Sequence, residues 1–410
     1  MSKTIIKNIK ELLQVREGNE VVKGEAMKTL PSIKDAYLVV ENDRIVAFGE
    51  MKDMPAMDGN VVDVTGKMVM PTFCDSHTHL VYAGSREKEF EGRIKGLTYE
   101  EIAAAGGGIL NSAKRLHDTS VEELVVQALP RLEEIKVMGT GAVEIKSGYG
   151  LSVEDEIKML RVIKELRKLS PLTIKATFLG AHAIPAKYKE NRKAYVDLII
   201  DEMMPIVHEE KLADYVDVFC DRGFFTQEET DRILQAGKEL GMRAKIHANE
   251  LDYSGGIQVG VKHNALSVDH LECTGDDEIE VLLNSETMPT LLPSTAFFLK
   301  LHYPPARKMI DAGLPVALAT DYNPGSSPSG KMSFILSLAC IHMGMMPQEA
   351  INAATVNSAY AMDVLGEHGT IAVGKKASLI VTKPIPSVAF IPYSFGSDLV
   401  EKVMIAGQWQ

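Results

Sequence analysis

The chain is poor in cysteine, has no long apolar run and carries no excess of positive charge. Its 410 residues include four cysteines, which lie far apart and form no C-x-x-C pair. This spacing argues against a disulfide framework and favours a reducing, cytoplasmic location. No stretch approaches the roughly 20 apolar residues that cross a bilayer, so we expect no membrane partner. The net charge of -12 argues against a nucleic-acid partner, which would favour a basic face.

The rest of the composition is that of an ordinary globular protein, with 45% apolar and 24% charged residues. At roughly 150 residues per domain, the length predicts two or three domains, or one large α/β barrel with an addition. A chain of this size buries most of its apolar surface without disulfides or structural metals. Disordered, collagenous and coiled-coil proteins are therefore excluded.

Both ends of the chain are rich in strand and turn signals. Residues 36–41 and 44–50 flank Asn42-Asp43, which predicts a β-hairpin. Residues 379–382 and 399–405 show a similar β-rich composition near the other end. We expect the two ends to pair into a single small β domain.

The middle of the chain alternates strand-like and helical segments. Residues 156–166 place their apolar side chains on one helical face, and residues 120–123 and 226–229 each resemble a capping box that opens a helix. Repeated strand–helix units predict a parallel sheet, and eight of them favour a closed (β/α)8 barrel over an open doubly wound sheet. The eight apolar runs are residues 69–74, 142–145, 173–179, 215–220, 243–246, 265–268, 288–292 and 316–320. The expected domain boundaries are 1–67 and 367–410 for the β domain and 68–366 for the barrel.

Chemistry in such a barrel sits at the carboxyl ends of the strands. The first run is followed by His77 and His79, and residues two apart in an extended chain point the same way, so both imidazoles can face one ion. An H-x-H pair alone is a weak signal in a chain with 11 histidines.

Four more polar residues follow other predicted strands and strengthen this signal. They are His247, Glu250, His270 and Asp321. Three histidines and one carboxylate suit a single divalent ion such as zinc with an open position for water, while Glu250 and His270 remain as proton carriers. The fourth strand ends at Cys220-Asp221 without a lysine, which argues against a two-metal site bridged by a modified lysine.

This set of residues resembles the amidohydrolase superfamily. The resemblance rests on H-x-H after the first strand, histidines at the fifth and sixth, and an aspartate at the eighth. It implies a (β/α)8 barrel in which a metal-bound water hydrolyses C–N or similar bonds. It also implies a small β-sandwich built from both chain ends.

Three further segments make the chain similar to the imidazolonepropionase family within that superfamily. They are S-R-E at 85–87, K-S-G-Y-G at 146–150 and N-P-G-S-S-P at 323–328, and the resemblance covers essentially the whole chain. It implies hydrolysis of a cyclic amide, in which 4-imidazolone-5-propanoate is opened by water to N-formimidoyl-L-glutamate during histidine degradation.

The resemblance also implies a role for each matching residue. One divalent ion, zinc or iron, would be held by His77, His79, His247 and Asp321. Protons would be handled by Glu250, His270 and Asp321, and which of them is the first base stays open. The substrate, a small molecule with a carboxylate tail, would contact Arg86, Tyr99, Tyr149, His182, Asn323, Gly325 and Ser326. A homodimer is implied as well.

Physical chemistry agrees with the role of Arg86, since its planar guanidinium can bind a carboxylate through two hydrogen bonds. A surface salt bridge for Arg86 and a packing role for Tyr149 remain open. The chain has Ser76 where the family pattern has proline and Asn249 where it has aspartate. Two other functions also stay open: another mononuclear amidohydrolase, such as a nucleobase deaminase, and an inactive barrel that serves as an interaction module.

Overall fold

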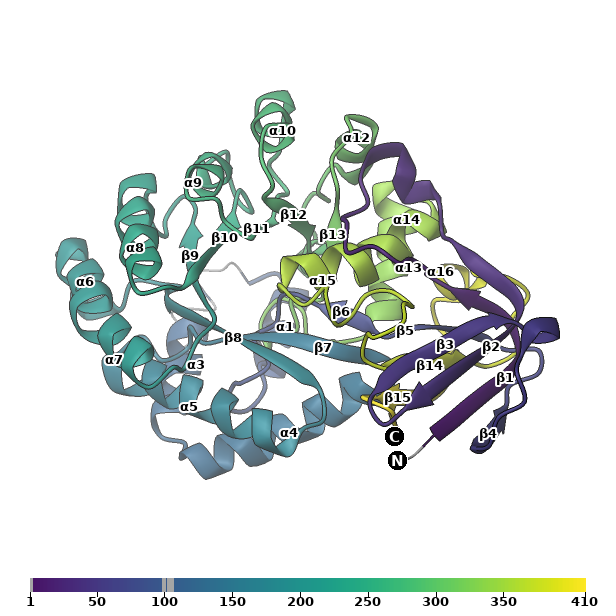
Figure 1. Cartoon of the computed structure of the whole chain (residues 1–410). Helices are drawn as coiled ribbons and strands as arrows, with labels where there is room; N and C mark the ends of the chain where they lie inside the picture. The colour runs from purple at the N-terminus through teal and green to yellow at the C-terminus, as the bar shows by residue number, and fades with distance from the viewer. Residues whose placement is uncertain (1–2, 98–100, 102–106) are drawn as a thin grey trace.

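The computed structural model describes residues 3–97, 101 and 107–410, so Tyr99 lies outside the described residues. Within them the chain forms a ring of strands and helices, with a β domain at one side in which the two ends of the chain meet (Figure 1). The domain boundaries expected from the sequence stay a prediction.

The β domain is one sheet of eight hydrogen-bonded strands that combines both ends of the chain. The antiparallel pair β5–β14 joins the N-terminal part to the C-terminal part, which confirms the predicted pairing of the ends. The hairpin around Asn42-Asp43 is present as β2 and β3. The strands are β1 (Lys3–Leu13), β2 (Ser32–Glu41), β3 (Arg44–Glu50), β4 (Asn60–Asp63), β5 (Met68–Pro71), β14 (Leu379–Thr382), β15 (Val400–Ile405) and β16 (Gln408–Trp409).

A bulge in β1 shapes this sheet. The register of the β1–β2 pair shifts between Ile6 and Ile9. On its other side, β1 pairs first with β4 and then with β5. A bulge bends a strand, and here it lies where the neighbour changes. Apolar residues from both chain ends form the core of this domain.

The central domain is a parallel eight-stranded barrel, which confirms the predicted fold class over the open doubly wound sheet. Its strands follow one another in chain order. The two outer strands meet just past their ends, where the Asp321 amide donates to the His77 carbonyl (3.0 Å) and the His79 amide to the Tyr322 carbonyl (2.9 Å). The strands are β6 (Phe73–Asp75), β7 (Thr140–Lys146), β8 (Thr173–Ala181), β9 (Tyr215–Cys220), β10 (Arg243–Ala248), β11 (Ser267–His270), β12 (Met288–Leu291) and β13 (Ala317–Leu318).

The apolar run 69–74 is not one strand. Its first part belongs to β5 of the β domain and its last part to β6 of the barrel. Thr72 stands between them, and its amide donates to the Ser378 carbonyl at 3.0 Å. An uninterrupted apolar run cannot show that its two halves enter different sheets, because both halves are buried.

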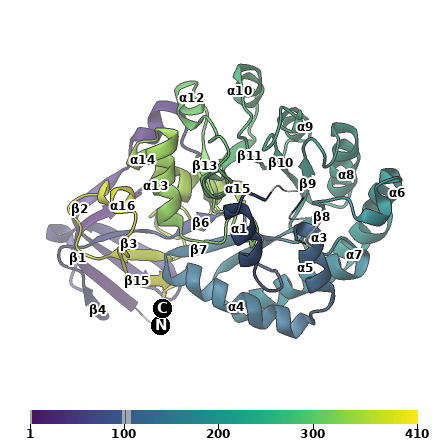
Figure 2. The same ribbon diagram turned by 180° about the vertical axis from the view of Figure 1, so that it is seen from behind.

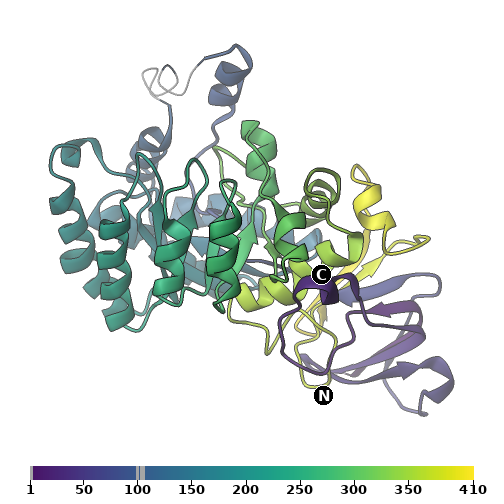
Figure 3. The same ribbon diagram turned by 90° about the horizontal axis from the view of Figure 1, so that it is seen from above.

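Helices surround the barrel strands (Figure 1). The capping boxes predicted at Ser120 and Thr226 open α4 and α8. Seen from behind, α1 lies in front of the strands (Figure 2). Seen from above, it projects beyond the barrel (Figure 3). The helices are α1 (Glu87–Ile94), α3 (Ile109–His117), α4 (Val121–Val137), α5 (Val153–Leu169), α6 (Arg192–Leu198), α7 (Met204–Glu209), α8 (Gln227–Glu239), α9 (Gly256–Lys262), α10 (Asp276–Leu283), α11 (Pro293–Leu299), α12 (Ala306–Asp311), α13 (Met332–Met343), α14 (Pro347–Asn352), α15 (Ser358–Ala361) and α16 (Phe390–Tyr393).

Candidate active site

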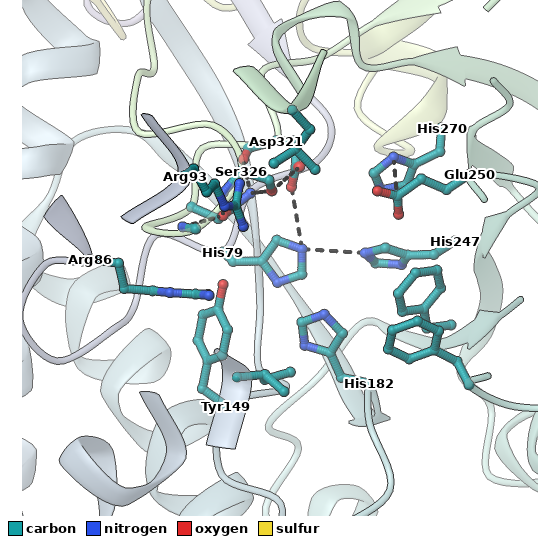
Figure 4. Close-up of a pocket in the computed structure, with 16 residues that line it drawn as sticks. His79, Arg86, Arg93, Tyr149, His182, His247, Glu250, His270, Asp321 and Ser326 are labelled. Atoms are coloured by element: carbon teal, nitrogen blue, oxygen red, sulfur yellow. Dashed lines mark hydrogen bonds and ion pairs between the residues drawn. The ribbon is translucent and has the colours of Figure 1, made fainter. Parts of the chain in front are cut away.

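Three imidazoles and one carboxylate converge at the carboxyl ends of β6, β10 and β13. His79 Nε2 lies 3.3 Å from His247 Nε2 and 3.5 Å from Asp321 Oδ1 (Figure 4). His77 Nε2 lies 3.7 Å from the same Asp321 oxygen. Each of the three histidines offers a ring nitrogen within 4.8 Å of the other two. The four residues predicted as metal ligands are therefore brought together around one point.

These donors fit a divalent cation. His77 Nδ1 lies 2.6 Å from Asp269 Oδ2, while its Nε2 is buried without a hydrogen-bond partner among the described residues. Burial holds the pKa of His77 and His79 well below the usual value, so both rings are neutral and keep a lone pair for a metal. A carboxylate on the second nitrogen fixes the ring orientation, a common arrangement at metal-binding histidines.

Asp321 presents one oxygen to the histidines because its other oxygen is already bound. Oδ2 accepts a hydrogen bond from Thr295 Oγ1 at 2.5 Å and a longer one from Ser326 Oγ at 3.3 Å. The backbone of Asp321 has a φ of +53°, a conformation that L-residues rarely adopt. Local strain and two hydroxyl groups thus hold the carboxylate in place.

A buried ionic network that was not predicted from the sequence lies beside the four predicted ligands. Lys146 Nζ contacts Glu144 Oε1 at 2.6 Å and Asp217 Oδ2 at 2.8 Å, and Lys245 Nζ contacts Glu144 Oε2. The side chains of these four residues are fully buried. Burial alone would lower the pKa of Lys146, but the carboxylates of Asp217 and Glu144 raise it above its usual value.

This network reaches the predicted metal ligands through two carboxylates. Asp217 Oδ2 lies 3.0 Å from His247 Nδ1, and Asp269 is the partner of His77. Lys146 lies 3.7 Å from Asp269. The signal in the sequence was the presence of charged residues inside otherwise apolar strands, since a charge is rarely buried without a partner.

Glu250 and His270 lie next to each other on the rim of the same site. His270 Nδ1 is 3.6 Å from Glu250 Oε2 and 3.8 Å from Glu272 Oε2. Burial raises the pKa of Glu250 to about 7. Burial lowers the pKa of His270, but the Glu250 and Glu272 carboxylates outweigh it and raise the value to about 10. Glu250 and His270 were predicted from the sequence, and Glu272 was not.

One cavity of about 160 Å³ connects these groups with most of the residues predicted to bind substrate. Tyr99 lies outside the described residues, so the structure does not place it. Five further lining residues were not predicted: Arg93, Ile109, Phe219, Phe224 and Leu299. The predicted residues that line the cavity are Arg86, Tyr149, His182, Asn323, Gly325 and Ser326, together with His79, His247, Glu250, His270 and Asp321.

Arg86 is held at the cavity wall from two sides. Its Nε and Nη2 donate to Glu89 Oε2 at 2.9 and 2.5 Å. Its Nη1 lies so close to Gly325 that a side-chain carbon there would stand 2.2 Å away. Gly325 therefore makes room for the guanidinium, and one edge of Arg86 stays directed at the cavity (Figure 4).

The side chain of Asn323 is occupied within its own loop. Asn323 Oδ1 accepts from the amides of Gly325 (2.7 Å) and Ser326 (2.8 Å). Its Nδ2 donates to the Asp321 carbonyl and to Ser326 Oγ, both at 2.7 Å. Asn323 thus shapes the loop beside Asp321, as asparagine commonly does in turns.

Asn249, one of the two departures from the family pattern, also has a local structural role. Its φ is +54°, which asparagine tolerates better than most residues. Its Nδ2 donates to the Cys273 carbonyl at 3.0 Å, and its Oδ1 accepts from Ser254 Oγ at 3.1 Å. The other departure, Ser76, is fully buried and its carbonyl accepts from Lys245 at 2.8 Å.

Comparisons with known proteins agree with this geometry. The model of the amidohydrolase family matches residues 68–410. Imidazolonepropionase of Flavobacterium johnsoniae is 58% identical and that of Alkaliphilus metalliredigens 40% identical; the alignments cover 99% and 100% of this chain and 99% and 98% of those proteins.

Solved structures add a likeness of fold. Guanine deaminase of E. coli aligns with a TM-score of 0.76 at 13% identity, covering 100% of this chain and 99% of that one. No helix in the described part of the chain is long and apolar enough to span a membrane. The chain belongs to the amidohydrolase family and, within it, to the imidazolonepropionases.

Proposed function

We propose that the protein hydrolyses the ring of 4-imidazolone-5-propanoate to N-formimidoyl-L-glutamate. The observation that carries the proposal is one cavity that joins the His77–His79–His247–Asp321 cluster to Arg86. The cluster offers three neutral nitrogen donors and one carboxylate, and Arg86 offers a fixed cation for the propanoate tail. The identity of 58% over 99% of the chain to an imidazolonepropionase supports the same substrate.

We propose one divalent ion, zinc or iron, bound by His77, His79, His247 and Asp321. When bound, such an ion lowers the pKa of water to near neutrality and polarises a carbonyl group. The neutral imidazoles offer lone pairs and Asp321 offers a negative charge, so the site favours a dication over an anion.

Proton handling falls to groups beside this cluster. Glu250 takes a proton from the attacking water, and its pKa of about 7 suits a group that both accepts and returns a proton near neutral pH. His270 donates a hydrogen bond to the ring carbonyl oxygen as negative charge develops there. The ring C–N bond then breaks, the carbon keeps the water oxygen as a carboxyl group, and the released nitrogen receives the proton.

Binding residues position the substrate for this attack. Arg86 pairs with the propanoate, and Tyr149, His182 and Ser326 lie where they can hydrogen-bond the ring or the tail. The His182 ring stacks on His79 with centroids 5.1 Å apart, and its Nδ1 lies 3.0 Å from the Gly148 carbonyl. Because that nitrogen donates to a carbonyl, Nε2 is the acceptor that remains for substrate. We propose that Tyr99 and the Asn323–Gly325 turn complete the binding set, and that the chain forms a homodimer in the cytoplasm.

The direct test is turnover of imidazolonepropanoate, followed by loss of its ultraviolet absorbance and by identification of the product. We expect N-formimidoylglutamate, no turnover after metal chelation and recovery when zinc or iron is added back. Guanine and cytosine serve as alternative substrates, because a deaminase would release ammonia from them. Deamination of a nucleobase without opening of the imidazolone would contradict the proposal.

A further inference from the structure

Glu272 is a buried carboxylate with unusually few partners. It lies just past the end of β11, 8% exposed. Neither of its side-chain oxygens has a hydrogen-bond partner within the described residues. Burial raises its pKa above the usual value. A buried carboxylate without hydrogen bonds destabilises a fold, so its presence here calls for a compensating role.

The group that Glu272 faces is His270. Glu272 Oε2 lies 3.8 Å from His270 Nδ1, and Glu250 Oε2 lies 3.6 Å from the same nitrogen. The two carboxylates come from different strand ends, after β10 and after β11 (Figure 4 shows Glu250 and His270). One ring nitrogen is thus flanked by two acceptors, and Glu272 does not line the cavity itself.

The backbone between His270 and Glu272 is strained. His270 has a φ of +84° and Leu271 a φ of +70°. Strain of this kind persists only where the surrounding structure over-determines it. The turn that these two residues make brings Glu272 back to the ring of His270.

We propose that Glu272 is a positioning residue that works through His270. Facing Nδ1 beside Glu250, it keeps the hydrogen on that nitrogen and fixes the plane of the ring, so that the protonated ring can donate its second hydrogen, on Nε2, to the substrate. The inference rests on the proposed function, in which His270 donates a hydrogen bond to the ring carbonyl. It adds a residue outside the cavity to the machinery of the reaction.

Two substitutions test this role, Glu272→Gln and Glu272→Leu. Glutamine keeps an acceptor oxygen without the charge, whereas leucine removes both. We expect kcat to fall by about tenfold for glutamine and about 100-fold for leucine, with KM within about threefold of wild type. Metal content stays unchanged. The melting temperature stays the same or rises, because an unpartnered buried carboxylate has been removed.

Glu278→Gln is the matched control. Glu278 is also 8% exposed and accepts a hydrogen bond from the Gly275 amide at 2.9 Å, at the start of α10. Its substitution is expected to lower the melting temperature and leave kcat unchanged. A wild-type kcat in Glu272→Leu overturns the inference. A loss of kcat accompanied by a lowered melting temperature also overturns it, because that result would indicate a purely structural role.

A spectroscopic measurement separates this inference from the proposed function. In protein labelled with ¹⁵N-histidine, His270→Gln assigns the His270 signals, and their shifts report which nitrogen carries hydrogen without any turnover. We expect hydrogen on both Nδ1 and Nε2 in wild type, and loss of the Nδ1 hydrogen from part of the population in Glu272→Leu. Identical His270 spectra in both proteins overturn the inference, whereas a wild type that fails to open the imidazolone overturns the proposed function.

Discussion

Two clusters of buried charge lie side by side in the barrel, and they are built differently. In the first, Lys146 contacts Glu144 and Asp217 at 2.6 and 2.8 Å. In the second, His270 lies 3.6 and 3.8 Å from Glu250 and Glu272, and three of the side-chain atoms lack a hydrogen-bond partner within the described residues. The first cluster is closely paired and the second is not.

This difference indicates a structural role for the first cluster and a role in proton transfer for the second. Close pairing in the first cluster offsets the cost of desolvating the lysines and carboxylates. Two carboxylates of this network also orient histidines: Asp269 orients His77, and Asp217 orients His247. Loose pairing in the second cluster leaves two groups whose pKa values both lie above their usual values, about 7 for Glu250 and about 10 for His270. Groups of that kind can exchange protons with a substrate.

Removing a lysine from the paired cluster is expected to have the largest effect on stability. Lys146→Met leaves the Glu144 and Asp217 carboxylates buried without their shared cation, which costs about 3–5 kcal/mol. Chemical denaturation measures the change. Lys175→Met is the control, since Lys175 is half-buried and lies 3.8 Å from Asp214. An equal loss in the free energy of unfolding for the two variants would show that the buried network stabilises the fold no more than a half-buried ion pair does.

Glu250→Gln in the loosely paired cluster is expected to change the rate instead. Loss of the proton acceptor lowers kcat by about 10²- to 10⁴-fold, while the melting temperature is maintained. Steady-state kinetics and thermal unfolding of the same preparation check both statements. If Glu250→Gln retains most of its kcat, Glu250 is not the base, and His270 or Asp321 takes that role.

A smaller effect is expected at the edge of the cavity, away from both clusters. Arg86→Met removes the cation proposed for the propanoate tail, so KM rises by about 10- to 100-fold and kcat changes less. Lys88→Met, at an exposed position in the first turn of α1, is the control. An unchanged KM in Arg86→Met would assign Arg86 to its ion pair with Glu89 alone.

The smallest effect concerns a third buried lysine, which lacks the carboxylates of the first cluster. Lys375 is 4% exposed and donates to the carbonyls of Leu365 and His368. Burial lowers its pKa from 10.5 to about 8. The folded state therefore binds fewer protons than the unfolded state between these values, so Lys375 destabilises the fold less as pH rises through this window.

This prediction is checked by the difference in melting temperature between wild type and Lys375→Met. Wild type is expected to gain on the variant from pH 8 to pH 10. A difference that stays constant with pH would mean that Lys375 keeps its usual pKa in the folded state.

Features with local signals were predictable from the sequence. The capping boxes of α4 and α8, the hairpin of β2 and β3 and the eight strand regions follow from periodicity and turn residues. The cluster of His77, His79, His247 and Asp321 followed from the position of each residue after a strand. In a parallel barrel all carboxyl ends meet at one rim, so these positions converge without knowledge of the packing.

Features that depend on packing were not predictable. Asp269 and Glu272 flank His270 in the sequence, and nothing local shows that the first faces His77 and the second faces His270. The run at 69–74 gave no sign that it serves two sheets. Asn323 was expected to contact substrate, and only the structure reveals that its amide group is fully engaged in its own loop.

The central claim is that three histidines and one aspartate bind a single ion, and a metal titration tests it most directly. Metal-depleted protein is titrated with zinc in competition with a chromophoric chelator, alongside His247→Ala. We predict one equivalent bound per chain in wild type and affinity reduced by at least about 100-fold in the variant, with both proteins folded. Zinc binding of equal strength in the two proteins, or none in wild type, would contradict the account.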